Sequence, residues 1–470
     1  MTMQAMELQV ILFTLLSGAV GVLTAAHALL YKRHPQSAFA WIAVSLTLPL
    51  VGATLYYLFG INRVRTRAQR LRAGQGQSQT PETKPVKPPA ALEELAALGT
   101  AVSGMTLTTG NRVDILHNGD QAYPAMLEAI RKASEHIYLS SYIFDSSPVG
   151  QEFVTALADA VSRGVDVRVL LDGVGELYSF PRARSLLRKH NVRFARFLPP
   201  RIWPPMVRIN LRNHRKILAI DGSIAFTGGM NIARRHMPSE SNDAFVVDIH
   251  FRLQGPIAAQ IECIFLDDWR FITGEDLPMA QVRPPAAGDA ICRAIAHGPD
   301  EEMDRLTALL SGAIAEARRR IAIMTPYFLP PRELIGVLQA AALGGLDVAV
   351  ILPSHNNLPY VHRATRHMLW ELLQRGVKVY YQPPPFVHSK LLLVDDQYAL
   401  VGSANIDTRS LRLNFELNVE IYEPRLVDEL SRHFEAVRAR SSAVTLHDVD
   451  SRRLATRLID GIAWLFSPYL

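Results

Sequence analysis

The stretch His214-Arg-Lys216-Ile-Leu-Ala-Ile-Asp221 decides the fold, because its polar pattern returns as His388-Ser-Lys390-Leu-Leu-Leu-Val-Asp395. In both copies a glycine, an asparagine and an arginine follow the histidine, at offsets of 14, 17 and 21 residues. A repeat made only for packing would be expected to repeat its apolar positions. This repeat preserves polar groups, so the chain is predicted to be an internal duplication whose repeated residues form a functional site. The matching residues are Gly228, Asn231 and Arg235 in the first copy and Gly402, Asn405 and Arg409 in the second.

The apolar run inside each motif is predicted to be a buried strand that ends in a turn. Side chains two positions apart on a strand share a face, so each histidine is expected to point the same way as its lysine. Lysine is a compact charge that suits phosphate oxygens, and histidine near neutral pH can be a nucleophile or a proton donor. Displacement at phosphorus benefits from both histidine roles, and the duplication supplies two histidines.

The motifs have two other possible interpretations, a surface pair beside a turn and a metal site. A single copy would more often be a pair of surface side chains beside a turn, but two matched copies argue against that. A metal site is not expected, because Cys263 and Cys292 are the only cysteines and the sequence has no Cys-x-x-Cys or His-Glu-x-x-His. A lysine two residues from each histidine would also repel a cation. The low cysteine content agrees with a reducing compartment.

These residues resemble the signature of the phospholipase D superfamily, a duplicated HxKxxxxD motif. Further stretches narrow the resemblance to the bacterial cardiolipin synthases, and the similarity covers nearly the whole chain. The resemblance implies an α/β fold in which two similar phospholipase D-like halves form one bilobal unit with both motifs facing a single pocket. It also implies a covalent phosphatidyl-histidine and no metal or other cofactor. The supporting stretches are residues 211–216, 248–252, 325–328, 403–410 and 414–416 and the ending Ser467-Pro-Tyr-Leu470.

The resemblance also implies a function. We expect a membrane-bound phosphatidyltransferase that makes cardiolipin from two phosphatidylglycerols and releases glycerol. Anionic phospholipids and the bilayer are the expected partners, nucleic acid is not, and the oligomeric state stays open. The alternatives are a phospholipase D-type hydrolase (a nuclease being less favoured), phosphatidylethanolamine as a co-substrate, and a non-catalytic scaffold. Ser354-His-Asn-Asn357 lacks the acidic residue of the family's motif, which leaves the acceptor open.

The expected site residues fall into three groups. By resemblance, His214 attacks phosphorus and His388 protonates the leaving glycerol, while Asp221 and Asp395 are expected to set the turns of the motif strands. The expected catalytic set is His214, Lys216, Asp221, His388, Lys390 and Asp395, and the expected phosphate-binding set, besides the lysines, is Asn231, Asn405, Gly229 and Ser403. By family analogy, Asp248 and Glu416 are expected to orient the opposing histidines.

Two apolar runs, residues 8–30 and 38–59, are each about long enough to cross a bilayer as a helix. A signal peptide fits the first run poorly, since no Lys or Arg precedes it and its apolar part is too long. Arginines crowd the exit of the second run, so the positive-inside rule predicts that the catalytic part faces the cytoplasm at a bacterial inner membrane. These are Arg63, Arg65, Arg67, Arg70 and Arg72, against Lys32 and Arg33 in the turn. The expected domains are a transmembrane hairpin (1–62), a basic Pro/Gly/Gln-rich linker (63–91) and the two halves (92–297 and 298–470).

The net charge of +6 is compatible with anionic lipid, nucleic acid or plain solubility. Arginines between residues 193 and 215 alternate with aromatic residues such as Trp203, a mixture that suits an anionic headgroup layer, nucleic-acid bases or a solvated loop. Near the end, Leu454, Leu458, Ile462 and Phe466 recur every four residues. That spacing predicts a helix that lies either at a membrane interface or against the domain.

Overall fold

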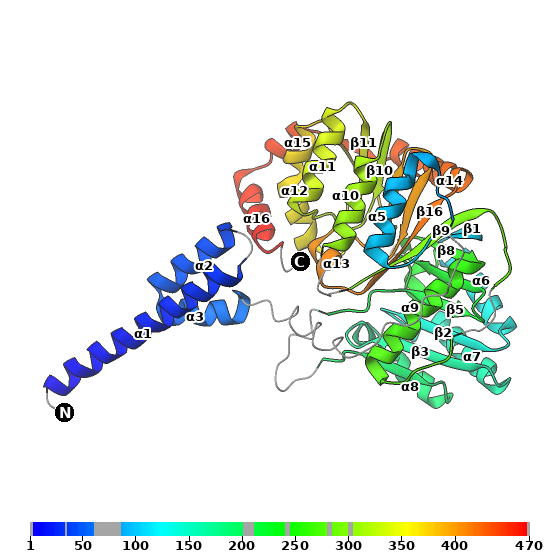
Figure 1. Ribbon diagram of the computed structural model, residues 1–470, viewed down its shortest axis with the longest axis horizontal. Coiled ribbons are helices and arrows are strands. Elements are labelled where there is room, and N and C mark those ends of the chain that lie inside the picture. Colours follow the sequence, from blue (N-terminus) through cyan, green and yellow to red (C-terminus); the bar gives the residue numbers. More distant parts are fainter. Residues whose placement is uncertain are drawn as a thin grey trace. The chain divides into compact units, whose positions relative to one another are not determined.

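The computed structural model describes residues 3–32, 35–60, 86–200, 211–239, 245–279, 284–298 and 304–467 (Figure 1). The chain divides into two compact units, Met1–Arg70 and Leu71–Leu470, called unit 1 and unit 2 below. The arginines predicted to follow the hairpin, most of the linker, Trp203 and the last three residues lie outside the described residues.

Unit 1 contains α1 (Met3–Tyr31), α2 (Pro35–Thr47), α3 (Pro49–Leu55) and the π-helical turn η1 (Tyr56–Gly60). Among the described residues, one segment, Met6–Tyr31, is long and apolar enough to cross a membrane, with a mean hydropathy of 2.0. The second expected span is divided into shorter helices, because Pro49 lacks the N–H that would continue α2. A two-pass hairpin therefore remains an expectation from the sequence.

Unit 2 is built on one 15-stranded sheet with the order β17-β12-β11-β10-β14-β15-β16-β9-β1-β8-β6-β5-β2-β3-β4, together with a separate pair, β13 and β7. The first strands are β1 (Thr108–His117), β2 (His136–Ser141), β3 (Asp166–Asp172), β4 (Phe194–Phe197), β5 (Ile217–Ile220), β6 (Ile224–Gly228), β7 (Val246–Val247) and β8 (Ile249–Gln254). The others are β9 (Ala290–His297), β10 (Arg320–Met324), β11 (Asp347–Pro353), β12 (Lys378–Gln382), β13 (Phe386–Val387), β14 (Leu391–Val394), β15 (Tyr398–Gly402), β16 (Glu416–Tyr422) and β17 (Ser442–Val444).

Apart from the edge strand β17, which has no counterpart, the strand order reads the same in both directions from the antiparallel pair β1–β9. One side continues β8-β6-β5-β2-β3-β4 and the other continues β16-β15-β14-β10-β11-β12, so the two motif strands, β5 and β14, hold equivalent places. The two halves are thus joined edge to edge in one sheet. Because β9 is the counterpart of β1, the repeat places the boundary between the halves before β9, whereas the sequence-based boundary lay after His297.

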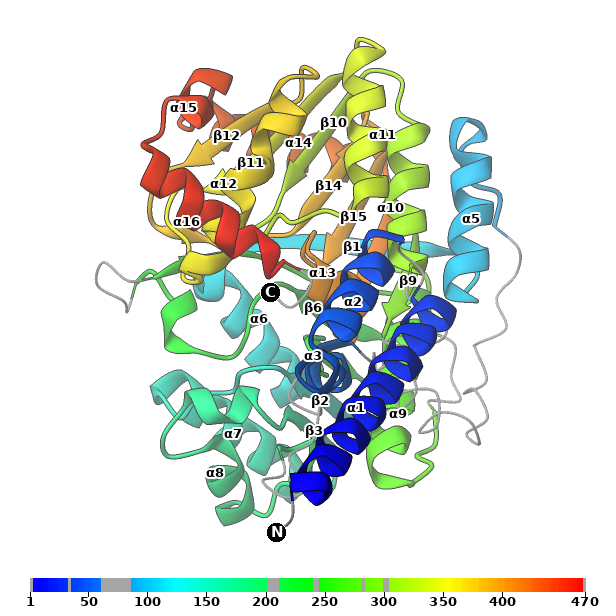
Figure 2. The same cartoon turned by 90° about the vertical axis from the view of Figure 1, so that its left-hand side faces the viewer.

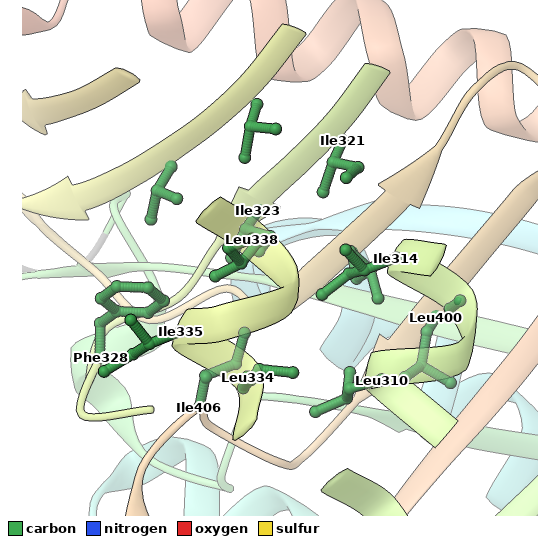
Figure 3. Close-up of a cluster of buried hydrophobic side chains, with 14 of the residues drawn as sticks. Leu310, Ile314, Ile321, Ile323, Phe328, Leu334, Ile335, Leu338, Leu400 and Ile406 are labelled. Atoms are coloured by element: carbon green, nitrogen blue, oxygen red, sulfur yellow. The ribbon is translucent and has the colours of Figure 1, made fainter. Parts of the chain in front are cut away.

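Helices cover the sheet, and each half has its own core (Figures 1 and 2). In the second core, Leu338 of α11 lies beside Ile323 of β10 (Figure 3). The helix that precedes the first half, α5, contributes Leu95 to this second core. The helices are α5 (Glu93–Ser103), α6 (Asn118–Lys132), α7 (Pro148–Ser162), α8 (Ala183–Lys189), α9 (Pro256–Thr273), α10 (Arg305–Ala315), α11 (Arg332–Leu343), α12 (Pro359–Leu373), α13 (Thr408–Arg412), α14 (Pro424–Ala439), α15 (Leu446–Asp450) and α16 (Leu454–Leu465), with short turns η2 (Ala90–Leu92), η3 (Gly175–Tyr178) and η5 (Arg234–His236).

Candidate active site

A carboxylate of the first half reaches the histidine of the second motif. β13 pairs with β7 in parallel, with Val387 opposite Val247. The His388 N–H donates to the Val247 carbonyl at 2.8 Å. The next residue, Asp248, then lies against the ring, with its Oδ2 2.9 Å from His388 Nδ1. Asp248 is fully buried, so this contact is shielded from water.

The reverse contact is also present: a carboxylate of the second half reaches the histidine of the first motif. Asn213 and Phe415 form a parallel bridge, and the His214 N–H donates to the Phe415 carbonyl at 2.9 Å. Glu416 Oε2 lies 3.0 Å from His214 Nδ1 and accepts the Ser403 hydroxyl at 2.5 Å. In both crossings the carboxylate engages Nδ1, which leaves Nε2 as the ring nitrogen available for chemistry. Each histidine is therefore oriented by the half to which it does not belong.

Both histidines line one cavity of about 320 Å³. Three residue types that the repeat preserves contribute a side chain from each half to its wall. Four of the sequence-predicted site residues thus come together there, along with two arginines of the repeat for which the sequence predicted no role. The six residues are His214, His388, Asn231, Asn405, Arg235 and Arg409.

The motif lysines are buried beside the histidine backbones. Lys216 Nζ donates to the His214 carbonyl at 2.6 Å, and Lys390 Nζ donates to the His388 carbonyl at 2.5 Å. Burial lowers the pKa of Lys216 to about 7 and that of Lys390 to about 8. An anion bound between the histidines would favour the charged form of both lysines, because opposite charges stabilise each other in a site of low dielectric constant.

Burial also lowers the pKa of both histidines. For His214 the burial effect is opposed by Glu416, whereas for His388 it is reinforced by Lys390 and Lys216, and the pKa of His388 falls well below its usual value. Both rings are therefore neutral at pH 7. A neutral imidazole is the form that can attack phosphorus. The other ring must gain a proton before it can act as an acid, and a bound phosphate anion would raise its pKa.

The motif aspartates lie at the other end of the motif strands. Asp221 accepts the backbone N–H groups of residues 134–136, and Asp395 accepts those of residues 318–320. Both adopt positive φ angles, of 49° and 51°. Seven residues of extended chain separate each aspartate from its histidine by roughly 20 Å. The structure thus keeps these two residues out of the cavity, and their carboxylates hold the turns before β2 and β10.

Gly229 and Ser403, which are expected to bind phosphate, lie against the two orienting carboxylates. A Cβ on Gly229 would come within 2.5 Å of Asp248 Oδ2. Ser403, at the equivalent place in the second half, donates its hydroxyl to Glu416. These contacts support the carboxylates, and phosphate binding by Gly229 and Ser403 stays a prediction from the sequence.

The symmetry of the repeat breaks at two positions on the cavity wall. Arg212 and Asn414 flank the first histidine, at the places that Phe386 and Val246 hold beside the second. The cavity wall therefore carries an additional arginine and an amide beside His214, where it has two apolar side chains beside His388. The difference was detectable in the sequence, because the residue two positions before each motif histidine shares its face on a strand.

Loops add residues that motif spacing did not indicate. The Tyr142 ring lies 5.2 Å from His214, and the rings of Tyr327 and His236 each lie 6.4 Å from His388. Tyr327 donates its hydroxyl to Asn357 Oδ1 at 2.8 Å. Of these side chains, Tyr327 and Asn357 belong to stretches that the resemblance singles out, Asn357 as part of the departure from the family's motif.

Comparison with known proteins identifies the family. The profile described as "Cardiolipin synthase, PLD-like domain" matches residues 126–269 and 310–438, one segment in each half. A cardiolipin synthase of Geobacillus sp. (strain WCH70) is 33% identical over 459 residues, covering 94% of this chain and 90% of that protein. This chain belongs to the cardiolipin synthase family. Cardiolipin synthase 2 of Bacillus anthracis is 32% identical and covers 94% of this chain and 88% of its own length.

Two further matches concern the fold and the N-terminus of this family member. The crystal structure of phosphatidylserine synthase from Haemophilus influenzae Rd KW20 has the same fold, with a TM-score of 0.62 at 14% identity over 76% of this chain and 95% of that one. The profile described as "Phospholipase D-nuclease N-terminal" matches residues 19–60. Together with the apolar helix α1, this match indicates that the protein associates with a membrane.

Proposed function

We propose that this protein transfers the phosphatidyl group of one phosphatidylglycerol to a second one, giving cardiolipin and glycerol. The observation that carries the proposal is the pair of histidines on one cavity, each with its Nδ1 engaged by a buried carboxylate of the opposite half. Such a pair supplies one nucleophile and one acid–base group to a single phosphorus atom. Membership of the cardiolipin synthase family supports phosphatidyl transfer over hydrolysis.

In the first step His214 Nε2 attacks the phosphorus of the donor lipid. The bond between phosphorus and the head-group glycerol oxygen breaks, and His388 gives that oxygen a proton as glycerol leaves. Lys216, Lys390, Asn231 and Asn405 stabilise the phosphate oxygens. The product of this half-reaction is a phosphatidyl group joined to His214 and a neutral His388.

In the second step His388 removes the proton from a hydroxyl of the acceptor lipid. The resulting oxygen attacks phosphorus, the bond to His214 breaks, and its electron pair returns to Nε2. Both histidines regain their starting protonation states. Because the acceptor oxygen takes the place of the leaving oxygen, the acceptor glycerol enters beside His388, where Tyr327 and Asn357 offer neutral hydrogen-bonding groups.

The cavity suits a head group and excludes acyl chains. Its volume is at the lower end of the range for small-molecule sites, roughly 300–1,000 Å³, and is far too small for two diacylglycerol moieties. Removing a lipid from its bilayer would cost about 0.8 kcal/mol for each CH₂ exposed to water, or on the order of 25 kcal/mol for two long chains. We infer that the lipids react while their chains remain in the membrane. We place unit 2 on the cytoplasmic side of a bacterial inner membrane, because arginines follow the second apolar run.

The deciding experiment is incubation of the purified enzyme with phosphatidylglycerol, labelled in its acyl chains and its head group, in mixed micelles. Cardiolipin and free glycerol in equal amounts are the expected products, and a His214→Asn/His388→Asn double variant should yield neither. Phosphatidic acid and glycerol without cardiolipin would instead identify a hydrolase. Adding phosphatidylethanolamine tests whether it acts as a co-substrate.

A further inference from the structure

The cavity mouth is edged by exposed apolar side chains from both halves. Tyr178 and Leu358 line the cavity and yet are 68% and 46% exposed, so they stand at its opening. Two residues beyond each of them, Phe180 is 95% exposed and Tyr360 is 71% exposed. We call these four residues the rim. Large apolar side chains gathered at one opening usually mark an interaction site.

A second apolar surface lies on α16, which packs along α12 (Figure 2). The inward side of α16 is identified by Asp460, which is fully buried and accepts Arg366 at 2.7 Å and Arg452 at 2.5 Å. The opposite side is exposed and apolar over the length of the helix. Its exposed residues are Leu454, Leu458, Ile459, Ile462, Leu465 and Phe466.

The charges around this outer face are positive. Asp460 is the only acidic residue of α16, and it is buried and paired. Arg453 and Arg457 are exposed at the start and in the first turns of the helix. An apolar face bordered by arginines is typical of helices that lie in the headgroup layer of an anionic bilayer. Both views show the C-terminal end of α16 directed towards the boundary between the halves, where the cavity lies (Figures 1 and 2).

We propose that the rim and the outer face of α16 form the surface by which unit 2 docks on an anionic bilayer, with the cavity mouth against the head groups. The aromatic rim side chains enter the interfacial layer, and the α16 arginines contact lipid phosphates. This surface explains how a cavity that holds only head groups reaches substrates whose chains stay in the membrane. It goes beyond the proposed reaction, because docking does not depend on which acceptor is used.

The direct test places a fluorescent label on the full-length chain in phosphatidylglycerol vesicles. Both native cysteines, Cys263 and Cys292, are buried, so a cysteine introduced at an exposed position is labelled selectively. Phe180→Cys and Leu458→Cys report the proposed surface. The matched control is Leu343→Cys at the end of α11, an apolar position that is 64% exposed but lies outside this surface.

Quenchers attached to lipid chains should quench the labels at positions 180 and 458 several times more strongly than the label at position 343. A water-soluble quencher should show the reverse order, and replacing the anionic lipid by phosphatidylcholine should weaken the difference. Equal quenching at all three positions would overturn the proposal. Protection from both quenchers would overturn it as well, because protein would then cover the surface, either a second copy of the chain or unit 1.

Kinetics provide a second test, which does not depend on the quenching experiment but does rest on the proposed reaction. Phe180→Ser/Tyr360→Ser removes two rim side chains outside the cavity lining. On phosphatidylglycerol vesicles kcat/KM should fall by about tenfold, the effect of losing roughly 1.4 kcal/mol of interfacial binding. On monodisperse short-chain phosphatidylglycerol it should not change, and Leu343→Ser should match the wild type on both substrates. An equal fall on both substrates would mean that the variant has a damaged active site, and it would overturn the docking role of the rim. If the wild-type enzyme showed no transfer activity, the proposed reaction would be refuted, but the quenching result would still stand.

Discussion

Lys216 is a buried lysine, so it is expected to affect stability and catalysis in opposite ways: its charge lowers the stability of the fold but is needed for turnover. Its folded pKa of about 7 lies below the unfolded value of about 10.4, so the folded chain binds fewer protons between these values and the stability contributed by this group rises with pH across that window. Lys216→Met should therefore melt at the same or a higher temperature at pH 6, while kcat falls roughly 10³-fold. A lower melting temperature, measured by circular dichroism, would show that the lysine is structural.

The lowered pKa values of both motif lysines also predict the alkaline side of the pH profile. Both must be charged to bind phosphate, and in the empty site they lose their protons near pH 7 and pH 8. The value of kcat/KM, which reports on the free enzyme, should decline above about pH 7, where Lys216 begins to lose its proton, far below the range of an ordinary lysine. Initial rates on dispersed lipid between pH 6 and pH 10 measure this, and a plateau extending to pH 10 would contradict it.

The two histidines are nearly equivalent by geometry, so their roles need a chemical test. With a phosphatidyl substrate that has a good leaving group, His388→Asn should still form the covalent lipid adduct, because protonation of the leaving oxygen is then unnecessary. His214→Asn should form none. Mass spectrometry of the adduct peptide reads the result, and an adduct on His388 would reverse the assignment.

The turns before β2 and β10 are held by single carboxylates, and this gives a prediction at the scale of the element. Asp221→Asn replaces a carboxylate that accepts three backbone N–H groups by an amide whose NH₂ opposes them, at a cost of about 2 kcal/mol of unfolding free energy. The activity of the folded fraction should persist, since Asp221 lies away from the cavity. Urea unfolding at pH 7 measures the loss, and Glu128→Gln on α6 is a surface control.

The same substitution has a defined pH dependence. Burial alone would raise the pKa of Asp221, but the backbone donors of residues 134–136 outweigh it and lower the pKa below its usual value. The stability from this carboxylate is therefore present above the unfolded pKa and is lost as pH falls through the folded one. The gap between wild type and Asp221→Asn should close as the pH is taken below about 3.9. A gap that is constant with pH would mean that the loss has another cause.

Individual elements were predictable where a local rule determined them. The motif strands β5 and β14 follow from their apolar runs, and the four-residue spacing of Leu454 to Ile462 gives α16. The second apolar run was expected as one helix, but Pro49 divides it, because a missing N–H outweighs the hydropathy of the surrounding residues. The sequence left two roles for α16 open, and the buried Asp460 identifies which side of the helix packs.

The whole molecule consists of two units, so the role of unit 1 can be tested by deletion. Removing residues 1–60 should leave turnover on detergent-dispersed lipid within a few-fold of the full chain, since the described residues that line the cavity belong to unit 2. Synthesis on vesicles should fall, because the tether raises the local concentration of the site at the bilayer. A truncated protein that folds and binds dispersed lipid but shows no turnover would make unit 1 part of the active assembly.

The candidate site was only partly predictable from the sequence. The repeat identified both histidines, lysines and asparagines, because their spacing is preserved. The β13–β7 crossing that delivers Asp248 joins residues far apart in the chain, and two-residue strands leave no periodic signal, so only the family resemblance indicated that contact. Gly229 and Ser403 were expected to bind phosphate because their segments bring backbone N–H groups to the site; the contacts of these residues with Asp248 and Glu416 could not be read from the sequence.

The exchange of carboxylates between the halves has a consequence for how such a chain could evolve. A single half holds a histidine without the carboxylate that orients it, so an ancestor with one copy could act only as a pair of identical chains. In such a pair every substitution appears at both ends of the cavity at once. After fusion, the residues at each end of the cavity could be substituted independently. Two identical chains could not have acquired the present difference between Arg212 and Phe386. Fusion of the two copies would thus have allowed the two ends of a symmetric cavity to take different roles.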